Sequence, residues 1–318
     1  MFYFTASPTK ERSRQNRRDR TALRRTRTSM EFLRPSTLVE ALEARSAHPD
    51  GVPIMGGTDV MVELNFDKRR PSALIDLTRV PELTEWGVDG DRTRLGAGVP
   101  YTRIIEHLSG RAPALAKASR SVASPQIRNR GTVGGNLGGA SPAGEAHPPL
   151  LATDAEIELA SVRGTRRVRA RDFYLSFRTT ALRPDELITA VLLPEAAGPQ
   201  QFAKIGTRNA MVIAVTSFSL ALDSERRAVG TGIGSAGPTP LRSEAAEEFL
   251  EGEFDWEDGR PLSEAVVRRF GELVASASRP IDDQRGTAEY RRHALSVMAR
   301  RALSWSVTDY RKGSARCA

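Results

Sequence analysis

Two glycine-rich segments contain the residues whose types and spacing could do chemistry. In the first, Ile54 to Asp59, an apolar run ends in Gly56 and Gly57. The second runs from Gly131 to Gly139 and adds threonine and asparagine side chains to its glycines. Glycine lets a backbone approach a ligand closely and aim consecutive N–H groups at an anion. Two such segments, about eighty residues apart, could clamp a diphosphate from both sides, which predicts a dinucleotide cofactor.

A third glycine cluster, Gly232 to Gly237, has the G-x-G-x-x-G spacing of an NAD site and follows an apolar run. In that fingerprint the last glycine lies inside the helix that binds the diphosphate. Here Gly237 is followed by Pro238 and Pro240, and proline opposes helical continuation at its own position and the one before. We therefore predict a turn at this cluster and no NAD site.

Other residue types exclude several kinds of chemistry. The single cysteine, Cys317, rules out disulfides within the chain, Cys-ligated zinc and a Cys-held iron–sulfur cluster. The four histidines are far apart, and the spacing of Glu145 and His147 without further ligands predicts no metal site. The chain contains no P-loop and no G-x-S-x-G motif, so nothing indicates phosphoryl transfer or hydrolysis.

The positive charge of the chain is concentrated at its start. Residues 1–29 contain nine basic and two acidic side chains, which gives +7 of the total formal charge of +8. No apolar periodicity accompanies this run, so we expect a disordered basic tail, with Met30 as an alternative first residue. The nearly neutral remainder predicts no nucleic-acid partner. No signal peptide or membrane span is recognisable, and we expect a cytoplasmic protein without membrane contact.

Periodicity and turn signals predict the elements that must position the glycines. Helix signals include a capping box at Thr37 and Glu40, and Asp89-Gly90 favours a hairpin. From these signals we expect helices over 37–47, 101–108, 113–122, 243–250, 262–277 and 290–306, and strands over 52–55, 73–77, 85–88, 94–97, 155–162, 187–193, 201–205, 211–222 and 228–233. A further helix is expected between the first glycine turn and the strand over 73–77, which makes the first segment a small α/β unit. Residues 124–149, rich in glycine and turn formers, are expected to form a long irregular functional loop.

The motifs resemble those of a known family. Gly56 to Asp59, Gln126 to Asn129, Thr132 to Leu137 and Ala140 to Glu145 resemble, in order and spacing, the FAD-binding medium subunits of molybdenum hydroxylases. That family includes xanthine dehydrogenase and aerobic carbon monoxide dehydrogenase. The resemblance covers about residues 30–310. It departs from the family pattern at Glu145, where aspartate is usual, and at Gly138-Gly139, where bulkier residues are usual, which implies a looser loop.

The resemblance implies the fold and its division into domains. We expect an α+β protein: a two-subdomain FAD-binding fold of the PCMH/vanillyl-alcohol-oxidase type, followed by a C-terminal α+β domain with strands first and helices after. The predicted boundaries are 30–85 and 86–198 for the two subdomains. The C-terminal flavoprotein domain of the carbon monoxide dehydrogenase type is expected over 199–312.

The resemblance also assigns cofactor-binding residues and leaves the catalytic set empty, because the flavin carries the chemistry. It implies that Ile54 to Val60, Thr132, Gly135 and Asn136 hold the diphosphate and ribityl chain, with Ala123 and Ser124 nearby. Glu145 would bond to hydroxyls of the cofactor, Ile188 would pack beside the isoalloxazine, and Lys204 would place a cation near the flavin. The assigned residues are Ile54, Met55, Gly56, Gly57, Thr58, Asp59, Val60, Ala123, Ser124, Thr132, Gly134, Gly135, Asn136, Glu145, Ile188 and Lys204.

The function implied by this resemblance is electron relay. FAD, held without a covalent bond, would take electrons from [2Fe–2S] clusters of a small partner subunit and pass them to NAD or another acceptor. A molybdopterin-binding large subunit would oxidise the substrate. Two alternatives stay open: a free-standing FAD-dependent oxidase or dehydrogenase of a small molecule, and a non-enzymatic binder of anionic partners through the Arg-rich tail.

Overall fold

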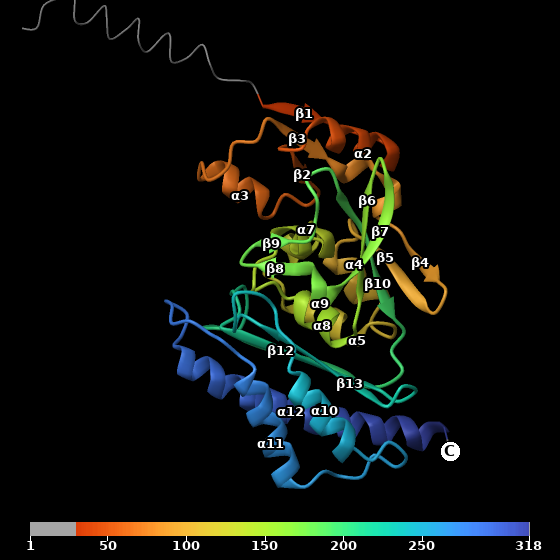
Figure 1. The fold of residues 1–318 in the computed structure, drawn as a ribbon, viewed down its shortest axis with the longest axis vertical. Coiled ribbons are helices and arrows are strands. Elements are labelled where there is room, and N and C mark those ends of the chain that lie inside the picture. The colour runs from red at the N-terminus through yellow and green to blue at the C-terminus, as the bar shows by residue number, and fades with distance from the viewer. Residues whose placement is uncertain (1–29, 318) are drawn as a thin grey trace, which may run out of the picture.

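The computed structural model describes residues 30–317 as three stacked layers, each built on its own sheet (Figure 1). The N-terminal sheet, the central sheet and the C-terminal sheet follow one another along the long axis. The predicted basic tail lies outside the described residues. Within the described part of the chain, no helix combines the length and apolar character needed to cross a membrane.

The first layer is a small parallel α/β unit. Strands β1 (Glu31–Leu33), β3 (Ala73–Asp76) and β2 (Val52–Ile54) pair in that order, and helix α2 (Leu38–Ala47) packs on them through the buried Ala41. Two 3-10 turns, Leu77–Arg79 and Pro81–Leu83, lead out of the unit. Helix α3 (Val60–Asn65) follows the first glycine turn, where the sequence predicts a helix before the next strand, and it contains no buried side chain.

The predicted N-terminal cap of α2 is confirmed. Thr37 Oγ1 accepts a hydrogen bond from Glu40 N at 3.2 Å, which satisfies one of the free amides of the first turn. The Glu40 carboxylate, however, accepts from Ser36 N and Oγ rather than from the cap residue itself. The glutamate of the capping box thus bonds to the residue before the cap instead of to the cap residue.

The second layer is a five-stranded antiparallel sheet. Its order is β4 (Trp86–Asp89), β5 (Arg92–Gly96), β10 (Leu187–Pro194), β6 (Glu156–Ser161) and β7 (Gly164–Arg169). The expected hairpin turns at Gly90, which adopts φ +64°. Helices α4 (Tyr101–His107), α5 (Pro113–Ser121), α8 (His147–Ala152) and α9 (Ala170–Phe173), and a short hairpin of β8 (Tyr174–Ser176) and β9 (Thr179–Thr180), complete this layer.

The expectation of one long irregular loop over 124–149 is wrong. The segment contains three short helices, α6 (Pro125–Arg128), α7 (Val133–Gly139) and the start of α8. Ser124 and Thr132 cap the first two with their hydroxyls. Glycine is a poor helix former, so the composition pointed away from helix. Packing of Val133 and Leu137 into the central core stabilises α7 despite that propensity.

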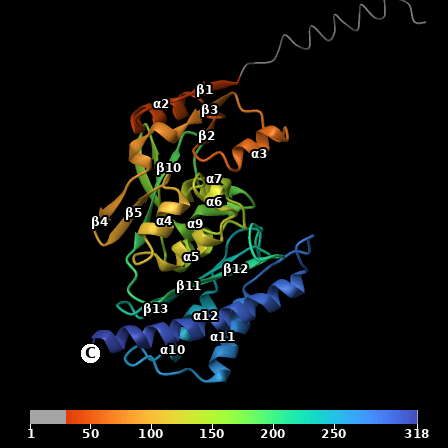
Figure 2. The ribbon, with the colours of Figure 1, turned by 180° about the vertical axis from the view of Figure 1, so that it is seen from behind.

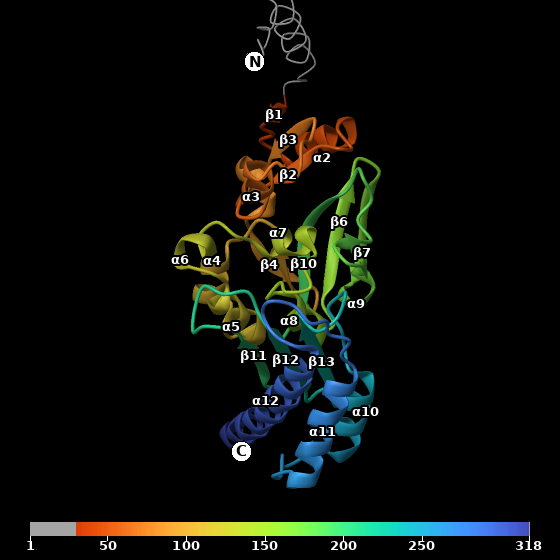
Figure 3. The ribbon, with the colours of Figure 1, turned by 90° about the vertical axis from the view of Figure 1, so that its left-hand side faces the viewer.

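The third layer has strands first and helices after, as the sequence predicts. Strands β11 (Gln200–Ile205), β12 (Thr216–Asp223) and β13 (Ala228–Gly234) form an antiparallel sheet. Helices α10 (Glu244–Glu253), α11 (Glu264–Ser276) and α12 (Ala288–Cys317) cover one face of it, while α5 and α8 of the central layer cover the other (Figures 2 and 3). The strand expected from residue 211 begins only at Thr216.

The third glycine cluster serves packing between layers. Strand β13 ends at Gly234 and is followed by bends, so the predicted turn is confirmed. A Cβ on Gly230 would lie 1.8 Å from the Ala152 carbonyl oxygen, and one on Gly232 would lie 1.9 Å from that of Pro148. The C-terminal sheet therefore approaches α8 through backbone atoms, and larger residues at these two positions would push the layers apart.

Replacing Gly232 with alanine is expected to lower the free energy of unfolding by more than about 3 kcal/mol, because the new methyl group meets a fixed backbone oxygen. Gly87→Ala in β4 is the matched control, since a Cβ there meets no atom within 4 Å. Urea denaturation followed by circular dichroism measures both. Equal stability of the two variants would contradict the close approach of β13 to α8.

Candidate cofactor-binding site

A cleft of about 670 Å³ lies where the three layers meet. Its lining includes both glycine segments, the start of α4, the first residues of β10 and the β11–β12 connection. This volume falls within the range of cofactor pockets in proteins. Most residues predicted to bind a cofactor line it: Met55, Gly56, Gly57, Thr58, Asp59, Val60, Ala123, Thr132, Gly134, Gly135, Asn136, Glu145 and Ile188.

The first glycine turn presents a row of free amides. In the described part of the chain, the N–H groups of residues 56–59 have no hydrogen-bond partner. Gly57 adopts φ +74°, a conformation that side chains other than glycine seldom accept. Ile54 does not line the cleft but packs beneath the turn, 3.5 Å from the point where a Cβ of Gly57 would lie. Consecutive unbonded amides at such a turn suit an anion such as a diphosphate.

Asp59 is the one acidic group of this turn. Burial, followed by the nearby carboxylate of Glu63, raises the pKa of Asp59 above its usual value, and Arg178 opposes the shift. Its side chain accepts no hydrogen bond from the described residues. It therefore has capacity left to accept a hydrogen bond from a ligand hydroxyl.

The second glycine segment forms helix α7, and the face of α7 towards the cleft is bare because its glycines carry no side chains. A Cβ on Gly135 would touch only Thr132 Oγ1, at 3.3 Å, while Cβ atoms on Gly138 and Gly139 would each meet a single side-chain atom at 3.9 Å. Gly134 points the other way, because its Cβ would clash with the Ala97 carbonyl oxygen at 2.6 Å. Three of these glycines thus open a surface for a ligand, and the fourth allows α7 to pack.

The expectation that this segment supplies a second row of free amides is wrong. Gly134 N donates to the Ala97 carbonyl oxygen at 3.0 Å, and Gly135 N donates to Thr132 Oγ1 at 3.0 Å. Thr132 therefore acts first as the cap of α7 and is almost fully buried. The physical reason is that a helix start needs its own amides satisfied, which sequence spacing did not reveal.

A buried ion pair closes one end of the cleft. Lys204 Nζ lies 2.8 Å from Glu145 Oε1 and donates to the Ser121 carbonyl oxygen at 2.9 Å. The two side chains are 8% and 13% exposed, respectively. Lys204 does not line the cleft itself, but it reaches the lining through Glu145. The pair joins β11 of the third layer to the second layer, and its low exposure strengthens the attraction.

The Glu145 loop is held by a network behind it. Asn136 Oδ1 accepts a hydrogen bond from Ala146 N at 3.3 Å, and His147 Nδ1 lies 2.6 Å from the Tyr174 hydroxyl. A Cβ on Gly144 would lie 2.3 Å from His147 Nε2. Burial lowers the pKa of His147 to about 3, so the ring is neutral at ordinary pH. This histidine positions the loop through its contacts with Tyr174 and Gly144.

The remaining predicted residues take different places. Ala123 lines the cleft with φ +32°. Ser124 is outside the lining, and its hydroxyl accepts from Ile127 N as the cap of α6. Ile188 lines the cleft beside α7, 3.9 Å from the position of a Cβ on Gly138.

Sequence analysis missed several lining residues. Tyr101 has a buried hydroxyl without a hydrogen-bond partner among the described residues, and burial raises its pKa well above the usual value. Arg45, from the last turn of α2, lines the opposite wall. Met211 and Ile213 reach the cleft from the β11–β12 connection. Both ends of the cleft are thus formed by residues whose local sequence indicated only helix or strand.

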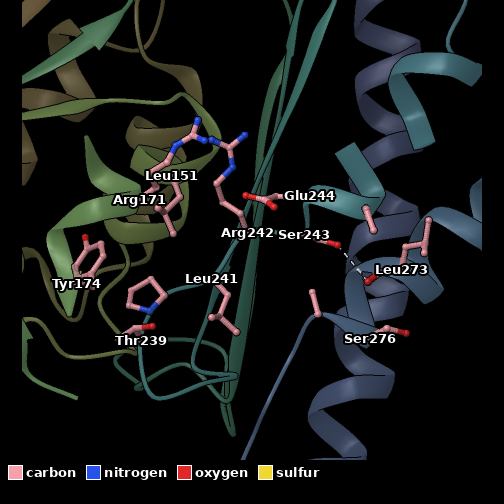
Figure 4. Close-up of a pocket in the computed structure, with 13 residues that line it drawn as sticks. Leu151, Arg171, Tyr174, Thr239, Leu241, Arg242, Ser243, Glu244, Leu273 and Ser276 are labelled. Atoms are coloured by element: carbon pink, nitrogen blue, oxygen red, sulfur yellow. Dashed lines mark hydrogen bonds between the residues drawn. The ribbon is translucent and has the colours of Figure 1, made fainter. Parts of the chain in front are cut away.

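A second cavity, of about 510 Å³, lies between α9 and the C-terminal helices (Figure 4). Arg171 and Arg242 extend side by side at its rim, and both are engaged with carboxylates, Asp154 for the first and Glu247 for the second. None of the residues predicted to bind a cofactor lines it. The predicted cofactor-binding residues gather at the glycine-lined cleft instead, which is therefore the better cofactor site.

The residues of the cleft fit a dinucleotide such as FAD. The free amides of residues 56–59 and the bare face of α7 leave room and donors for a diphosphate. Asp59 and Glu145 can accept hydrogen bonds from sugar hydroxyls, and the Tyr101 hydroxyl is an unused polar group at the wall. No histidine or cysteine belongs to the lining described by the structure, in keeping with a cofactor held without a covalent bond.

Comparison with known families gives two matches that together cover most of the chain. Residues 28–196 match the family described as the FAD binding domain in molybdopterin dehydrogenase. Residues 201–306 match the carbon monoxide dehydrogenase flavoprotein C-terminal domain.

Relatives and solved structures agree with these matches. The nicotine 6-hydroxylase medium subunit of Paenarthrobacter nicotinovorans is 32% identical over 86% of this chain and 96% of its own length. The nicotinate dehydrogenase FAD-subunit of Eubacterium barkeri is 36% identical over 70% of this chain and 79% of its own. The structure of quinoline 2-oxidoreductase from Pseudomonas putida 86 superimposes with a TM-score of 0.81 and 25% identity, covering 89% of this chain and 98% of that chain.

Gly135→Asp is expected to abolish FAD binding without unfolding the chain. The new side chain meets only Thr132 Oγ1, at 3.3 Å from its Cβ, and its charge would repel a diphosphate in the cleft. Gly135→Asn, of nearly equal size but uncharged, is the control. We expect FAD to bind at least about tenfold more weakly to the aspartate variant than to the asparagine variant, measured by quenching of flavin fluorescence. Retention of FAD by Gly135→Asp would contradict the placement of the diphosphate at α7.

The buried His147 predicts a pH dependence of stability. Because its pKa in the folded chain, about 3, lies below its usual 6.5, the unfolded chain binds the extra proton below pH 6.5. The stability contribution of the neutral ring is complete above that pH and is lost as the pH falls towards 3. Between pH 7.5 and 5.0 the free energy of unfolding should drop by about 2 kcal/mol more in the native chain than in His147→Gln. If urea denaturation showed that the free energy of unfolding changes equally with pH in the native chain and in His147→Gln, the prediction would be wrong.

Proposed function

Since this chain belongs to the family of FAD-binding subunits of molybdopterin dehydrogenases, the molybdenum hydroxylases, we propose that it relays electrons through FAD. The electrons come from [2Fe–2S] clusters of a small partner subunit and pass to NAD or another acceptor. A molybdopterin-binding large subunit completes the assembly. The single observation that carries the proposal is the cleft, in which free turn amides face the bare glycine side of α7.

The roles of the chain's own residues follow from their positions. The amides of residues 56–59 bind the diphosphate, and the glycine face of α7 lets it come close to the backbone. Glu145 accepts hydrogen bonds from cofactor hydroxyls while its other contact, Lys204, is held beside the flavin end. Ile188 packs against the cofactor beside α7. When bound, FAD supplies redox chemistry that no side chain of this cleft has.

A cation held at Lys204 favours a reduced ring that carries negative charge, because opposite charges attract more strongly where water is excluded. Lys204 is kept in place by Glu145 and by the Ser121 carbonyl. Its side chain is buried, so solvent screens it little. In this proposal Lys204 tunes the flavin rather than reacting with a substrate, because it reaches the lining of the cleft only through Glu145.

Exposed apolar side chains beside the cleft support a partner subunit at this face. Phe66, just after α3, is 72% exposed, and Phe177, in the β8–β9 hairpin, is 63% exposed. An ion pair of 3.3 Å between Arg178 and Glu63 brings the hairpin to α3. Large exposed apolar groups close together indicate an interaction surface. Lys68 Nζ lies over the Phe66 ring, 5.8 Å from its centroid, which favours a partner with an acidic group at this point.

The test is to produce the chain together with its molybdenum and [2Fe–2S] partner subunits, and also alone with excess FAD. The chain alone should show a flavin absorption spectrum that is released into the supernatant by acid. Its flavin should be reduced by the organic substrate only in the complex. Reduction by a small-molecule substrate in the isolated chain would favour a free-standing flavin enzyme, and a folded chain that binds no flavin would contradict the proposal altogether.

Substitutions that introduce charge at the exposed aromatic side chains test the partner surface independently of the cofactor site. Phe66→Glu and Phe177→Glu are each expected to weaken association with the partner subunits by at least about tenfold while FAD is retained. Val88→Glu is the control, because Val88 is 69% exposed on β4, a strand that lies on the side opposite α3 in Figure 1. Size-exclusion chromatography with flavin absorbance measures both properties. Intact complexes in all three variants would place the partner elsewhere.

A further inference from the structure

Arg45 is a buried cation without a counter-ion. The residue is 8% exposed. Its Nη1 donates to the Gly51 and His48 carbonyl oxygens, while its Nε is buried and has no partner in the part of the chain that the structure describes. No carboxylate among residues 30–317 comes within ion-pair distance of it. Two backbone carbonyls therefore carry the whole interaction.

Such a group is unfavourable unless something completes its surroundings. Burial lowers the pKa of Arg45, and Arg69 lowers it further, whereas Asp185 and Asp50 act from a distance in the other direction. Leaving a buried polar donor unpaired destabilises a fold by about 1–3 kcal/mol, and more for a charged one. Guanidinium groups also stack on aromatic rings and donate in a plane. The group is therefore suited to a flat ligand with acceptor atoms.

The position of Arg45 decides which ligand group it meets. It lines the cleft together with apolar residues of the first layer and of β10, Pro53, Leu77 and Leu187. The other end of the cleft is lined by the β11–β12 connection and by Glu145, the partner of Lys204. The glycine segments lie between. A dinucleotide with its diphosphate at the glycines and its flavin beside Lys204 must direct its adenosine towards Arg45.

We propose that Arg45 is the residue that recognises the adenine ring of FAD, by donating a hydrogen bond from its guanidinium to a ring nitrogen between apolar walls. Adenine offers ring nitrogens as acceptors and a flat face, which match a planar donor. The apolar side chains of Pro53 and Leu77 suit the faces of the ring. This inference rests on the proposed function, because it takes FAD to be the ligand of the cleft.

The experiment compares FAD with FMN, which shares the flavin but lacks the adenosine. Dissociation constants are measured by fluorescence for the full chain and for Arg45→Met. We expect the constant for FAD to rise at least about tenfold, as for loss of one hydrogen bond to a charged group, and the constant for FMN to stay within about twofold. Arg69→Met is the control, since Arg69 lines the same end but is half exposed. It should leave both constants within about twofold.

Each outcome separates the two proposals. Equal weakening of FAD and FMN in Arg45→Met would mean that the residue only supports the fold, and it would overturn the inference, as would unchanged FAD affinity. Arg45→Lys keeps the charge but cannot bond to Gly51 and adenine in one plane. It replaces Arg45→Met if that variant does not fold, with the same selective loss of FAD expected. Failure of the unaltered, folded chain to bind either flavin would instead contradict the proposed function.

Discussion

The cleft depends on one close contact between two backbones. A Cβ on Gly56 would lie 2.0 Å from the carbonyl oxygen of Arg130, so the first glycine turn rests directly on the segment that leads into α7. The amide of Tyr101 donates to the Gly131 carbonyl oxygen at 3.0 Å, and Pro100 bridges to Thr132. These contacts fix the start of α7 relative to the turn. Both then face the same space, which is why FAD can be held between two layers.

Buried charge organises the two ends of that space. At one end Lys204 and Glu145 form an ion pair across the junction of the second and third layers. At the other end Arg45 has only backbone carbonyls for partners. A buried charge with a close counter-ion supports the fold. A buried charge without a counter-ion favours binding of a ligand that supplies the missing partner. In the proposed binding mode this asymmetry gives the cleft a direction, with the flavin towards the third layer and the adenosine towards the first.

Local signals found most regular elements, and they failed where tertiary packing overrides propensity. The cap at Thr37, the hairpin at Gly90 and the sheet-then-helix order of the third layer follow from the residues themselves. Helix α7 was missed because glycine is unfavourable in helices, yet its buried Val133 and Leu137 anchor it. Helix α3 follows the first glycine turn as expected, although it contains no buried side chain to give a periodic apolar pattern.

The sequence alone determined the family and the cofactor, because the glycine motifs need particular residues at fixed spacing and these survive as a readable pattern. It also determined that glycine, rather than a larger residue, occupies the positions where two backbone segments lie in contact. Only the tertiary structure decided which glycines face the ligand and which face Ala97 or α8, and whether Thr132 serves a helix or a cofactor. It alone brought Arg45, Tyr101 and Met211 to one cleft. Those contacts join residues far apart in the chain, and no local pattern encodes them.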